Sequence, residues 1–276
     1  MKVKFNDKRL TESFCVQISV LSAFATLILA FFPISKENQI LFGVIFFLSI
    51  TILYLLDWVK ANRLKSIEIK IEGSIVCVKE GDIFKEKELK VIAFNEYFDT
   101  QVDDQIISKS SLNGIYIKHF VNNPSALDKH IEDFPFMKSN ILDVNNNRKA
   151  GKKQRYKLGT IVVHGDYLLT AFSKFNEANE AHLTMPEYLG FLINFWDQIN
   201  TVYANKSVST PILGSGITRI KGHKGISDED LLKIMIWTFR VSEMRFKHPA
   251  KLTIIIHPDK LKDINLLDIK STKNGF

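Results

Sequence analysis

The segment of the chain best suited to chemistry is residues 210–218, which contains two glycines and follows an apolar stretch with the character of a strand. Gly214 and Gly216 allow backbone amide groups to approach a phosphate without obstruction by side chains. The same pattern is common in tight turns, and the spacing matches neither a Walker loop nor a complete Rossmann fingerprint. The segment therefore indicates either a phosphate-binding loop or a simple turn.

The other polar residues do not indicate a catalytic or metal site. Asp103 and Asp104 are adjacent, and neighbouring carboxylates on a loop more often face solvent than act as an acid and base pair. Two cysteines, Cys15 and Cys77, can build neither a disulfide framework nor a zinc centre. The histidines that could bind a metal are scattered, at His164, His182, His223, His248 and His257. We expect no catalytic residue, no metal and no cofactor, and the chain is predicted not to be an enzyme.

Net charge alone does not select a partner. A formal net charge of +7 is compatible with nucleic acid, anionic lipid or a phosphorylated ligand. Residues 145–157 are polar and rich in lysine and arginine, and such runs usually lack packing, so we expect an exposed loop there. Contact of this loop with lipid headgroups or with ligand phosphates is the alternative.

Two apolar stretches near the N-terminus predict a hairpin of transmembrane helices in residues 1–62. The spans are about residues 14–32 and 39–57, each close to the roughly 20 residues that a helix needs to cross a bilayer. A signal peptide or a buried hairpin of a soluble domain would be the alternative. Basic residues precede the first span and follow the second. The positive-inside rule therefore predicts a multi-pass membrane protein with both termini in the cytoplasm.

The first span carries a stripe of small and mildly polar residues. Cys15, Ser19, Ser22 and Thr26 are spaced so that they share one helical face. In lipid, such residues permit close approach and hydrogen bonding between helices. The stripe predicts either packing against the second span or self-association of the chain, with Gln17 adding an amide near one end.

Residues 63–276 read as a cytoplasmic α/β domain. A β-hairpin is expected over residues 67–71 and 75–79, with further strands over 89–94, 159–164, 167–172, 208–213 and 252–257. Thr184 and Glu187 form a capping box before one amphipathic helix, and Ser227 begins a second helix that continues to residue 244. Strands that alternate with long helices indicate a parallel or mixed sheet with helices on its faces.

Four short motifs in this domain resemble those of a macro domain, the α/β module that binds ADP-ribose. They are Gly81-Asp82-Ile83, a strand over residues 91–94 closed by Asn95, Ser110-Ser111-Leu112-Asn113-Gly114, and Pro211-Ile212-Leu213-Gly214-Ser215-Gly216-Ile217. Together with the hairpin, they make the chain similar to the membrane-bound effectors of type II Thoeris anti-phage systems. The resemblance implies an α/β, macro-like three-layer domain with a mixed sheet, preceded by a two-helix transmembrane hairpin.

The resemblance also implies a function. A TIR-domain partner enzyme would convert NAD into an ADP-ribose derivative such as histidine-ADP-ribose, which the macro-like domain would bind. Binding would trigger homo-oligomerisation and disruption of the bacterial inner membrane, and the infected cell would die. No nucleic-acid partner is expected.

By motif, the resemblance assigns ligand-binding roles to individual residues. Asp82 would accept from the adenine amino group beside Ile83, Asn95 would approach the distal ribose, and Phe98 would pack or stack. The segment Ser111, Leu112, Asn113 and Gly114 would also approach the distal ribose, and the segment Leu213, Gly214, Ser215, Gly216 and Ile217 would hold the pyrophosphate.

Two departures from the macro pattern argue against hydrolysis. Asn95 is followed by Glu96, Tyr97 and Phe98, where hydrolytic macro domains carry a second asparagine, and residues 111–114 lack a glycine run. A membrane-anchored ADP-ribosyl hydrolase and a passive membrane-anchored binding module remain the alternative functions.

Overall fold

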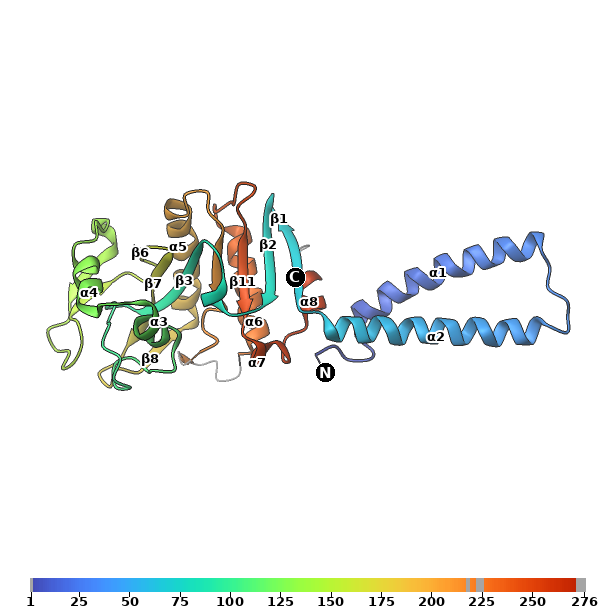
Figure 1. Ribbon diagram of the computed structural model, residues 1–276, viewed down its shortest axis with the longest axis horizontal. Coiled ribbons are helices and arrows are strands. Elements are labelled where there is room, and N and C mark those ends of the chain that lie inside the picture. Colours follow the sequence, from blue (N-terminus) through green and yellow to red (C-terminus); the bar gives the residue numbers. More distant parts are fainter. Residues whose placement is uncertain (1, 217–218, 222–225, 272–276) are drawn as a thin grey trace.

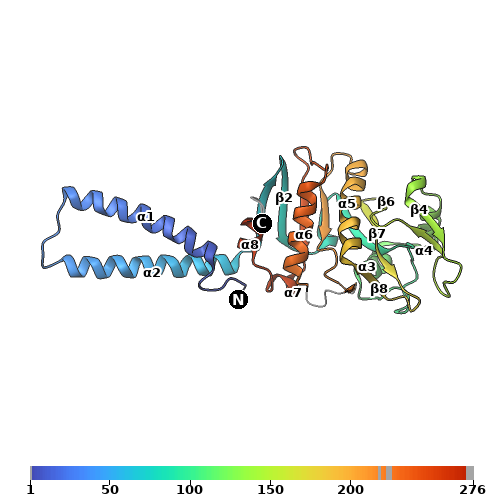
Figure 2. The same ribbon diagram turned by 180° about the vertical axis from the view of Figure 1, so that it is seen from behind.

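A computed structural model describes residues 2–216, 219–221 and 226–271 (Figure 1). Ile217, one of the predicted ligand-binding residues, lies outside this range. The chain begins with two long helices that project from one end of an α/β domain, as Figures 1 and 2 show from opposite sides.

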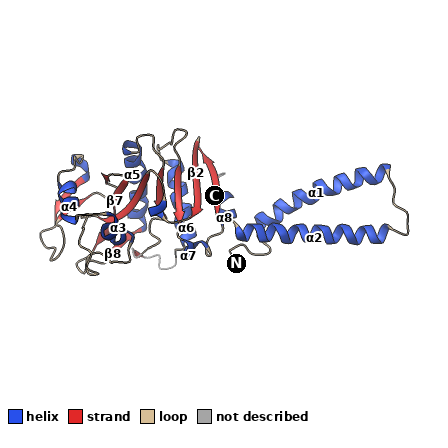
Figure 3. Ribbon diagram, viewed as in Figure 1, coloured by secondary structure: helices blue, strands red, loops and turns tan. Residues whose placement is uncertain are grey.

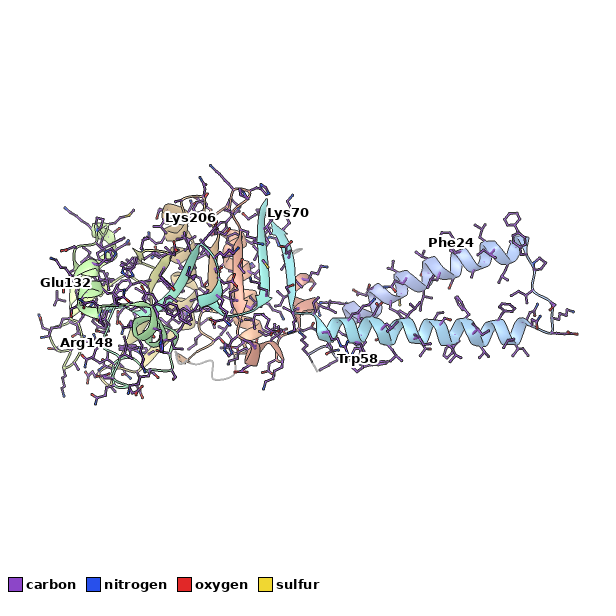
Figure 4. All side chains as sticks on the ribbon, viewed as in Figure 1. Phe24, Trp58, Lys70, Glu132, Arg148 and Lys206 are labelled. Carbon is purple, nitrogen blue, oxygen red and sulfur yellow. The ribbon has the colours of Figure 1, made fainter. Side chains whose placement is uncertain are left out.

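The two N-terminal helices are longer than the predicted spans. They are α1 (Lys8–Phe31) and α2 (Gln39–Arg63), and both are long and apolar enough to cross a membrane by length and composition. The most apolar 18-residue window of each helix has 0% of its residues buried, which excludes a buried hairpin of a soluble domain. Side chains such as Phe24 instead project outward (Figure 4).

Local chemistry sets the ends of this hairpin. The carboxylate of Asp7 accepts a hydrogen bond from the Arg9 amide at 3.0 Å and so caps α1. Helix α1 ends before Pro33, which disfavours helical backbone in the residue that precedes it. At the other end, only Leu64 and Lys65 separate α2 from the first strand. The division into residues 1–62 and 63–276 stays a prediction.

The domain is built on a twisted mixed sheet. Strands β2 (Ser74–Glu80), β11 (Leu252–Ile256), β9 (Val208–Pro211), β3 (Leu89–Asn95) and β7 (Tyr167–Phe175) are parallel neighbours in that order. The strands β1 (Ser66–Ile71), β6 (Ile161–His164) and β8 (Ala181–Thr184) add antiparallel pairs, and β10 (Arg219–Lys221) lies parallel to β8. The predicted hairpin is confirmed: β1 and β2 join at Glu72 and Gly73, both at positive φ.

Helices cover both faces of this sheet (Figure 3). On one face α5 (Met185–Val202) and α6 (Asp228–Val241) pack on side chains such as Val91 and Leu168. On the other, α3 (Leu112–Phe120) and α4 (Pro124–Glu132) pack on the alternate residues Ile92 and Leu169. Both faces of the central strands are therefore buried, and the predicted three-layer α/β fold with a mixed sheet is confirmed.

Short elements complete the domain. They are the 3-10 turns η1 (Ile83–Lys85) and η2 (Lys138–Asn140), the helices α7 (Pro258–Leu261) and α8 (Leu266–Ser271), and a separate hairpin of β4 (Ile141–Val144) and β5 (Gln154–Tyr156). Several predicted boundaries differ by one to three residues, and two of them have a clear position. Strand β9 stops at Pro211, which has no N–H to donate, and α6 stops at Val241 rather than at residue 244.

The basic segment 145–157 is only partly the exposed loop that its composition predicts: Lys149, Lys153 and Lys157 are exposed, whereas Arg148, Lys152 and Arg155 are partly buried. It closes the β4–β5 hairpin, and the guanidinium of Arg148 is buried against the carboxylate of Asp99. Lys152 pairs with Asp128, and Arg155 pairs with Glu96 and Asp143. The acidic partners lie 12 to 59 residues away along the chain, so the sequence alone did not reveal that three of the six basic side chains are paired.

Candidate ligand-binding site

Three of the predicted segments meet at one edge of the sheet. Asp82 follows β2, the turn at residues 212–216 follows β9, and Asn95 closes β3, and these strands are parallel members of one sheet. The carboxyl ends of parallel strands share an edge, which is where α/β proteins commonly bind ligands. In Figure 1 this is the lower edge, marked by α7 after β11 and by β8 after β7.

The glycine turn is anchored on one side and open on the other. Gly214 has φ +94°, and a Cβ placed there would lie 3.5 Å from the Leu231 side chain of α6. The buried Leu213 donates its amide to the Met235 sulfur at 3.3 Å, and its carbonyl accepts from the Tyr188 hydroxyl at 2.7 Å. Among the residues that the structure describes, a Cβ on Gly216 would meet nothing within 4 Å. Gly216 therefore presents open space, while Leu213 and Gly214 fasten the turn to α5 and α6.

Ser215 has a structural role in this turn. Its amide donates to the Ile212 carbonyl at 3.3 Å and closes the turn. The two glycines thus serve different purposes. Gly214 satisfies a left-handed backbone conformation, and Gly216 leaves space.

Asp82 is exposed at the start of η1. One of its carboxylate oxygens accepts from the Phe84 amide at 3.0 Å, which fixes the side chain at the edge of the sheet. Its neighbour Ile83 is buried and packs inward. The structure therefore places Asp82 where a ligand can reach it, and gives Ile83 a place in the core.

Asn95 is engaged within its own loop. Its amide nitrogen donates to Asp99 Oδ2 at 2.8 Å, and its amide oxygen accepts from the Tyr97 amide at 3.0 Å. The carboxylate of Asp99 in turn receives Arg148 Nη2 at 2.6 Å and Nη1 at 3.1 Å. The Arg148 guanidinium also lies 3.9 Å from the centre of the Tyr97 ring. This network was missed at the sequence level, and it shows that the Asn95 amide shapes the loop.

Phe98 does not offer a ring to a ligand. It is 0% exposed and packs edge-on against Tyr156, with ring centres 5.3 Å apart. Of the two roles that the sequence allowed, the structure shows packing, because the left-handed backbone at Phe98 (φ 50°) turns the ring into the core under α3 and α4.

The Ser111–Gly114 segment forms the N-terminus of α3. The Ser111 hydroxyl accepts from the Gly114 amide at 3.2 Å and donates to Asn113 Oδ1 at 2.6 Å, while Leu112 packs on the core. A Cβ on Gly114 would lie 2.1 Å from the Ser108 carbonyl oxygen. Gly114 is therefore required for close packing of the chain on itself.

A cavity of about 300 Å³ lies on the flank of α5, between this helix and the β4–β5 hairpin. Ion pairs line it: Arg155 contacts Glu96 at 3.1 Å, and Lys174 contacts Glu187 at 2.6 Å. Burial favours the neutral form of Glu187, but hydrogen bonds from Lys174 and from the Thr184 amide outweigh burial and lower its pKa to about 2. Nothing in the sequence indicated this cavity, because its charged residues come from separate segments of the chain.

The fold and the edge residues together define a macro-type α/β domain preceded by two apolar helices. A family model described as the macro domain of Thoeris protein ThsA matches residues 76–257. The chain is also 41% identical over 232 residues to the Thoeris protein ThsA of Bacillus amyloliquefaciens strain Y2, covering 82% of this chain and 77% of the relative. The chain therefore belongs to the Thoeris ThsA family.

Solved macrodomains are also similar to this chain. A mutant macrodomain of Oceanobacillus iheyensis aligns with a TM-score of 0.44 and 15% identity, covering 77% of this chain and 100% of that protein. Another mutant of the same macrodomain, solved with ADPR, aligns with the same TM-score and 13% identity, covering 76% and 96%.

Proposed function

We propose that this protein is a membrane-bound effector of anti-phage defence whose macro domain binds an ADP-ribose derivative. The ligand would come from a TIR-domain enzyme that consumes NAD, with histidine-ADP-ribose as the expected form. Membership of the Thoeris ThsA family supports this proposal.

The observation that carries the proposal is the order of the three edge segments. Across the strands β2, β11, β9 and β3, Asp82 comes first, the glycine turn next and the Asn95 loop last. Neighbouring strands lie about 4.8 Å apart, so the row extends over roughly 14 Å. Adenine at Asp82, a diphosphate at Gly216 and a distal ribose near Asn95 and the start of α3 would follow this row in the order in which ADP-ribose carries them.

Binding without hydrolysis fits the side chains at the distal end of the row. The amide of Asn95 is held by Asp99 and by the loop backbone. The next residue, Glu96, accepts from Arg155 at 3.1 Å, where hydrolytic macro domains carry another asparagine. We propose that this site recognises its ligand and has no catalytic role.

The helical hairpin supplies the output of this effector. The exposed faces of α1 and α2 would lie in the inner membrane with both termini in the cytoplasm, and ligand binding would favour homo-oligomers that disrupt the bilayer. Cys15, Ser19 and Thr26 are exposed on α1, and Ser22 is half-buried, so most of the stripe is open to another copy of the chain.

Calorimetric titration of the full-length chain in mild detergent, with ADP-ribose and with histidine-ADP-ribose, tests the ligand. The variant Gly216→Val should weaken binding at least about tenfold, a cost of about 1.4 kcal/mol, because its branched side chain would occupy the open space of the turn. Gly43→Val is the matched control, since a Cβ there also meets nothing within 4 Å among the described residues and Gly43 lies on α2, outside the macro domain. Equal affinity of both variants for the nucleotide would refute the assignment of the turn.

A further inference from the structure

A polar cluster joins the base of the helical hairpin to the macro domain. Its members come from the start of α1, the first two turns of α6, and α8 with the residue before it, and α8 lies between α6 and the hairpin (Figure 2). We call it the hairpin clasp, and it comprises Asp7, Arg9, Glu229, Lys233, Asn265 and Asp268.

One half of the clasp connects α8 to α6. The backbone amide of Asn265 donates to Glu229 Oε2 at 2.7 Å. The Lys233 ammonium bridges Glu229 Oε1 at 2.9 Å and Asp268 Oδ2 at 2.6 Å. These three charged side chains are less than one fifth exposed, so water and salt screen their interactions less than on an open surface.

The other half connects α8 to α1. The Asn265 side-chain amide donates to Asp7 Oδ2 at 2.9 Å, Arg9 forms an ion pair with Asp268, and Arg9 Nε donates to Ser271 Oγ at 2.9 Å. Leu267 of α8 packs beside these contacts on the apolar base of the hairpin. Helix α8 is thus fastened to both the hairpin and α6.

The same two turns of α6 touch the glycine turn on their opposite face. A Cβ on Gly214 would lie 3.5 Å from Leu231, and the Leu213 amide contacts the Met235 sulfur. Leu231 follows Glu229 by two positions, which places the two side chains about 200° apart around the helix. One rigid helical segment therefore has the candidate phosphate-binding turn on one side and the clasp on the other.

We propose that α6 couples ligand binding at the glycine turn to release of the hairpin clasp. The coupling rests on the proposed function, because it needs a ligand at Gly216. A nucleotide that draws the turn toward itself moves Leu231, and with it Glu229 and Lys233. Clasp contacts of 2.6 to 2.9 Å are lost with a shift of about 1 Å, because hydrogen bonds weaken beyond about 3.2 Å. The hairpin is then free to rearrange in the bilayer.

Thermodynamic linkage sets the sign of the effect. If the ligand favours the released state, a change that shifts the chain toward the released state must also strengthen ligand binding. Arg9→Gln removes the charge that pairs with Asp268. Asn265→Asp replaces the donor to Asp7 with a carboxylate, yet keeps the oxygen that accepts from the Leu267 and Asp268 amides and caps α8. Both substitutions, which break different contacts of the clasp, should therefore raise the affinity for the ligand.

The experiment measures affinity and hydrogen exchange on the full-length chain in lipid nanodiscs, with ADP-ribose and histidine-ADP-ribose as the nucleotides. Arg9→Gln and Asn265→Asp should each bind the nucleotide at least about fivefold more tightly than wild type. A fivefold change is at the lower end of the affinity changes that coupled sites usually show. In the wild type, the nucleotide should increase exchange over residues 265–271. Lys8→Gln is the matched control, since Lys8 is exposed and pairs only with the exposed Glu12 among the described residues, and it should bind as wild type.

The outcomes separate this inference from the function on which it rests. Unchanged affinity in both clasp variants, or unchanged exchange over residues 265–271 while the wild type binds nucleotide, overturns the coupling and leaves the binding site standing. Absence of nucleotide binding by the wild type overturns both. A fluorescent-dye release assay on liposomes measures membrane disruption. Liposomes that carry the clasp variants should release dye at a lower nucleotide concentration than liposomes that carry Lys8→Gln.

Discussion

Asp99 and Arg148 hold together the loop that follows β3. The Asp99 carboxylate receives two guanidinium nitrogens, the Lys152 amide and the Asn95 side chain, and both charged groups are almost completely buried. A buried carboxylate with this many donors is stable only while the donors remain. The conformation of Asn95 at the ligand edge therefore depends on an arginine far along the chain, at the end of the domain opposite the hairpin (Figure 4).

Arg148→Met should destabilise the domain by about 3 kcal/mol or more, because it leaves the Asp99 charge buried without its partner. Thermal and denaturant unfolding of the detergent-solubilised chain measure the loss. Lys206→Met, an exposed lysine replaced in the same way, should change stability by less than about 0.5 kcal/mol. Similar values for the two variants would mean that the ion pair contributes little to the fold.

At the level of elements, the N-terminus of α5 is fastened to the sheet as well as capped. Thr184 and Glu187 satisfy each other's backbone amides in a capping box, and Lys174 of β7 pairs with the same Glu187 carboxylate. Helix α5 also carries Tyr188, which holds the glycine turn through the Leu213 carbonyl. A substitution that disrupts the cap of α5 is therefore expected to disturb the glycine turn as well.

The depressed pKa of Glu187 predicts a stability that depends on pH. The pKa of Glu187 in the folded chain, about 2, lies below the usual glutamate value of 4.5, so its contribution to stability is fully present above about pH 4.5 and is lost as the pH falls toward 2. Wild type should therefore melt at a higher temperature than Glu187→Gln at neutral pH, and the difference should shrink below about pH 4.5. A difference in melting temperature that stays constant down to pH 3 would contradict this assignment.

Sequence reasoning succeeded for elements whose determinants are local. The β1–β2 hairpin, the capping box of α5, the start of α6 after Ser227 and the two apolar helices are each encoded within a few neighbouring residues. It failed where the partners are far apart. Arg148 lies 49 residues from Asp99, and its neighbours in sequence suggested only a solvated basic loop. The packing of Phe98 against Tyr156 likewise depends on a residue that only the tertiary fold brings close.

The whole molecule is elongated, with the hairpin at one end of its long axis (Figure 1). Helices α1 and α2 are close together at the domain and diverge toward the turn that joins them. The hydroxyls of Ser19 and Thr26 on α1 donate to carbonyls of their own helix, at 2.9 and 2.8 Å. The stripe therefore has surface available for a neighbouring hairpin in the membrane.

Replacing Ser19 and Ser22 together by Leu should reduce chemically crosslinked oligomers of the ligand-bound chain severalfold, because bulk on the stripe prevents close approach of helices. Val16→Leu with Val20→Leu is the control, since these exposed residues lie on another part of the α1 surface. Gel analysis after crosslinking in liposomes gives the measurement. Equal crosslinking of both double variants would exclude the stripe as the association face.

The contact between Arg9 and Ser271 joins residues 262 positions apart, and this has a consequence for biosynthesis. Chains fold progressively from the N-terminal side as they leave the ribosome. In the proposed membrane-bound form, α1 and α2 would therefore enter the bilayer before the C-terminal residues that contact them have been made. Every newly made copy would then pass through a period in which α1 and α2 lack their contacts with α8, and a cell that makes this protein would have to tolerate that interval.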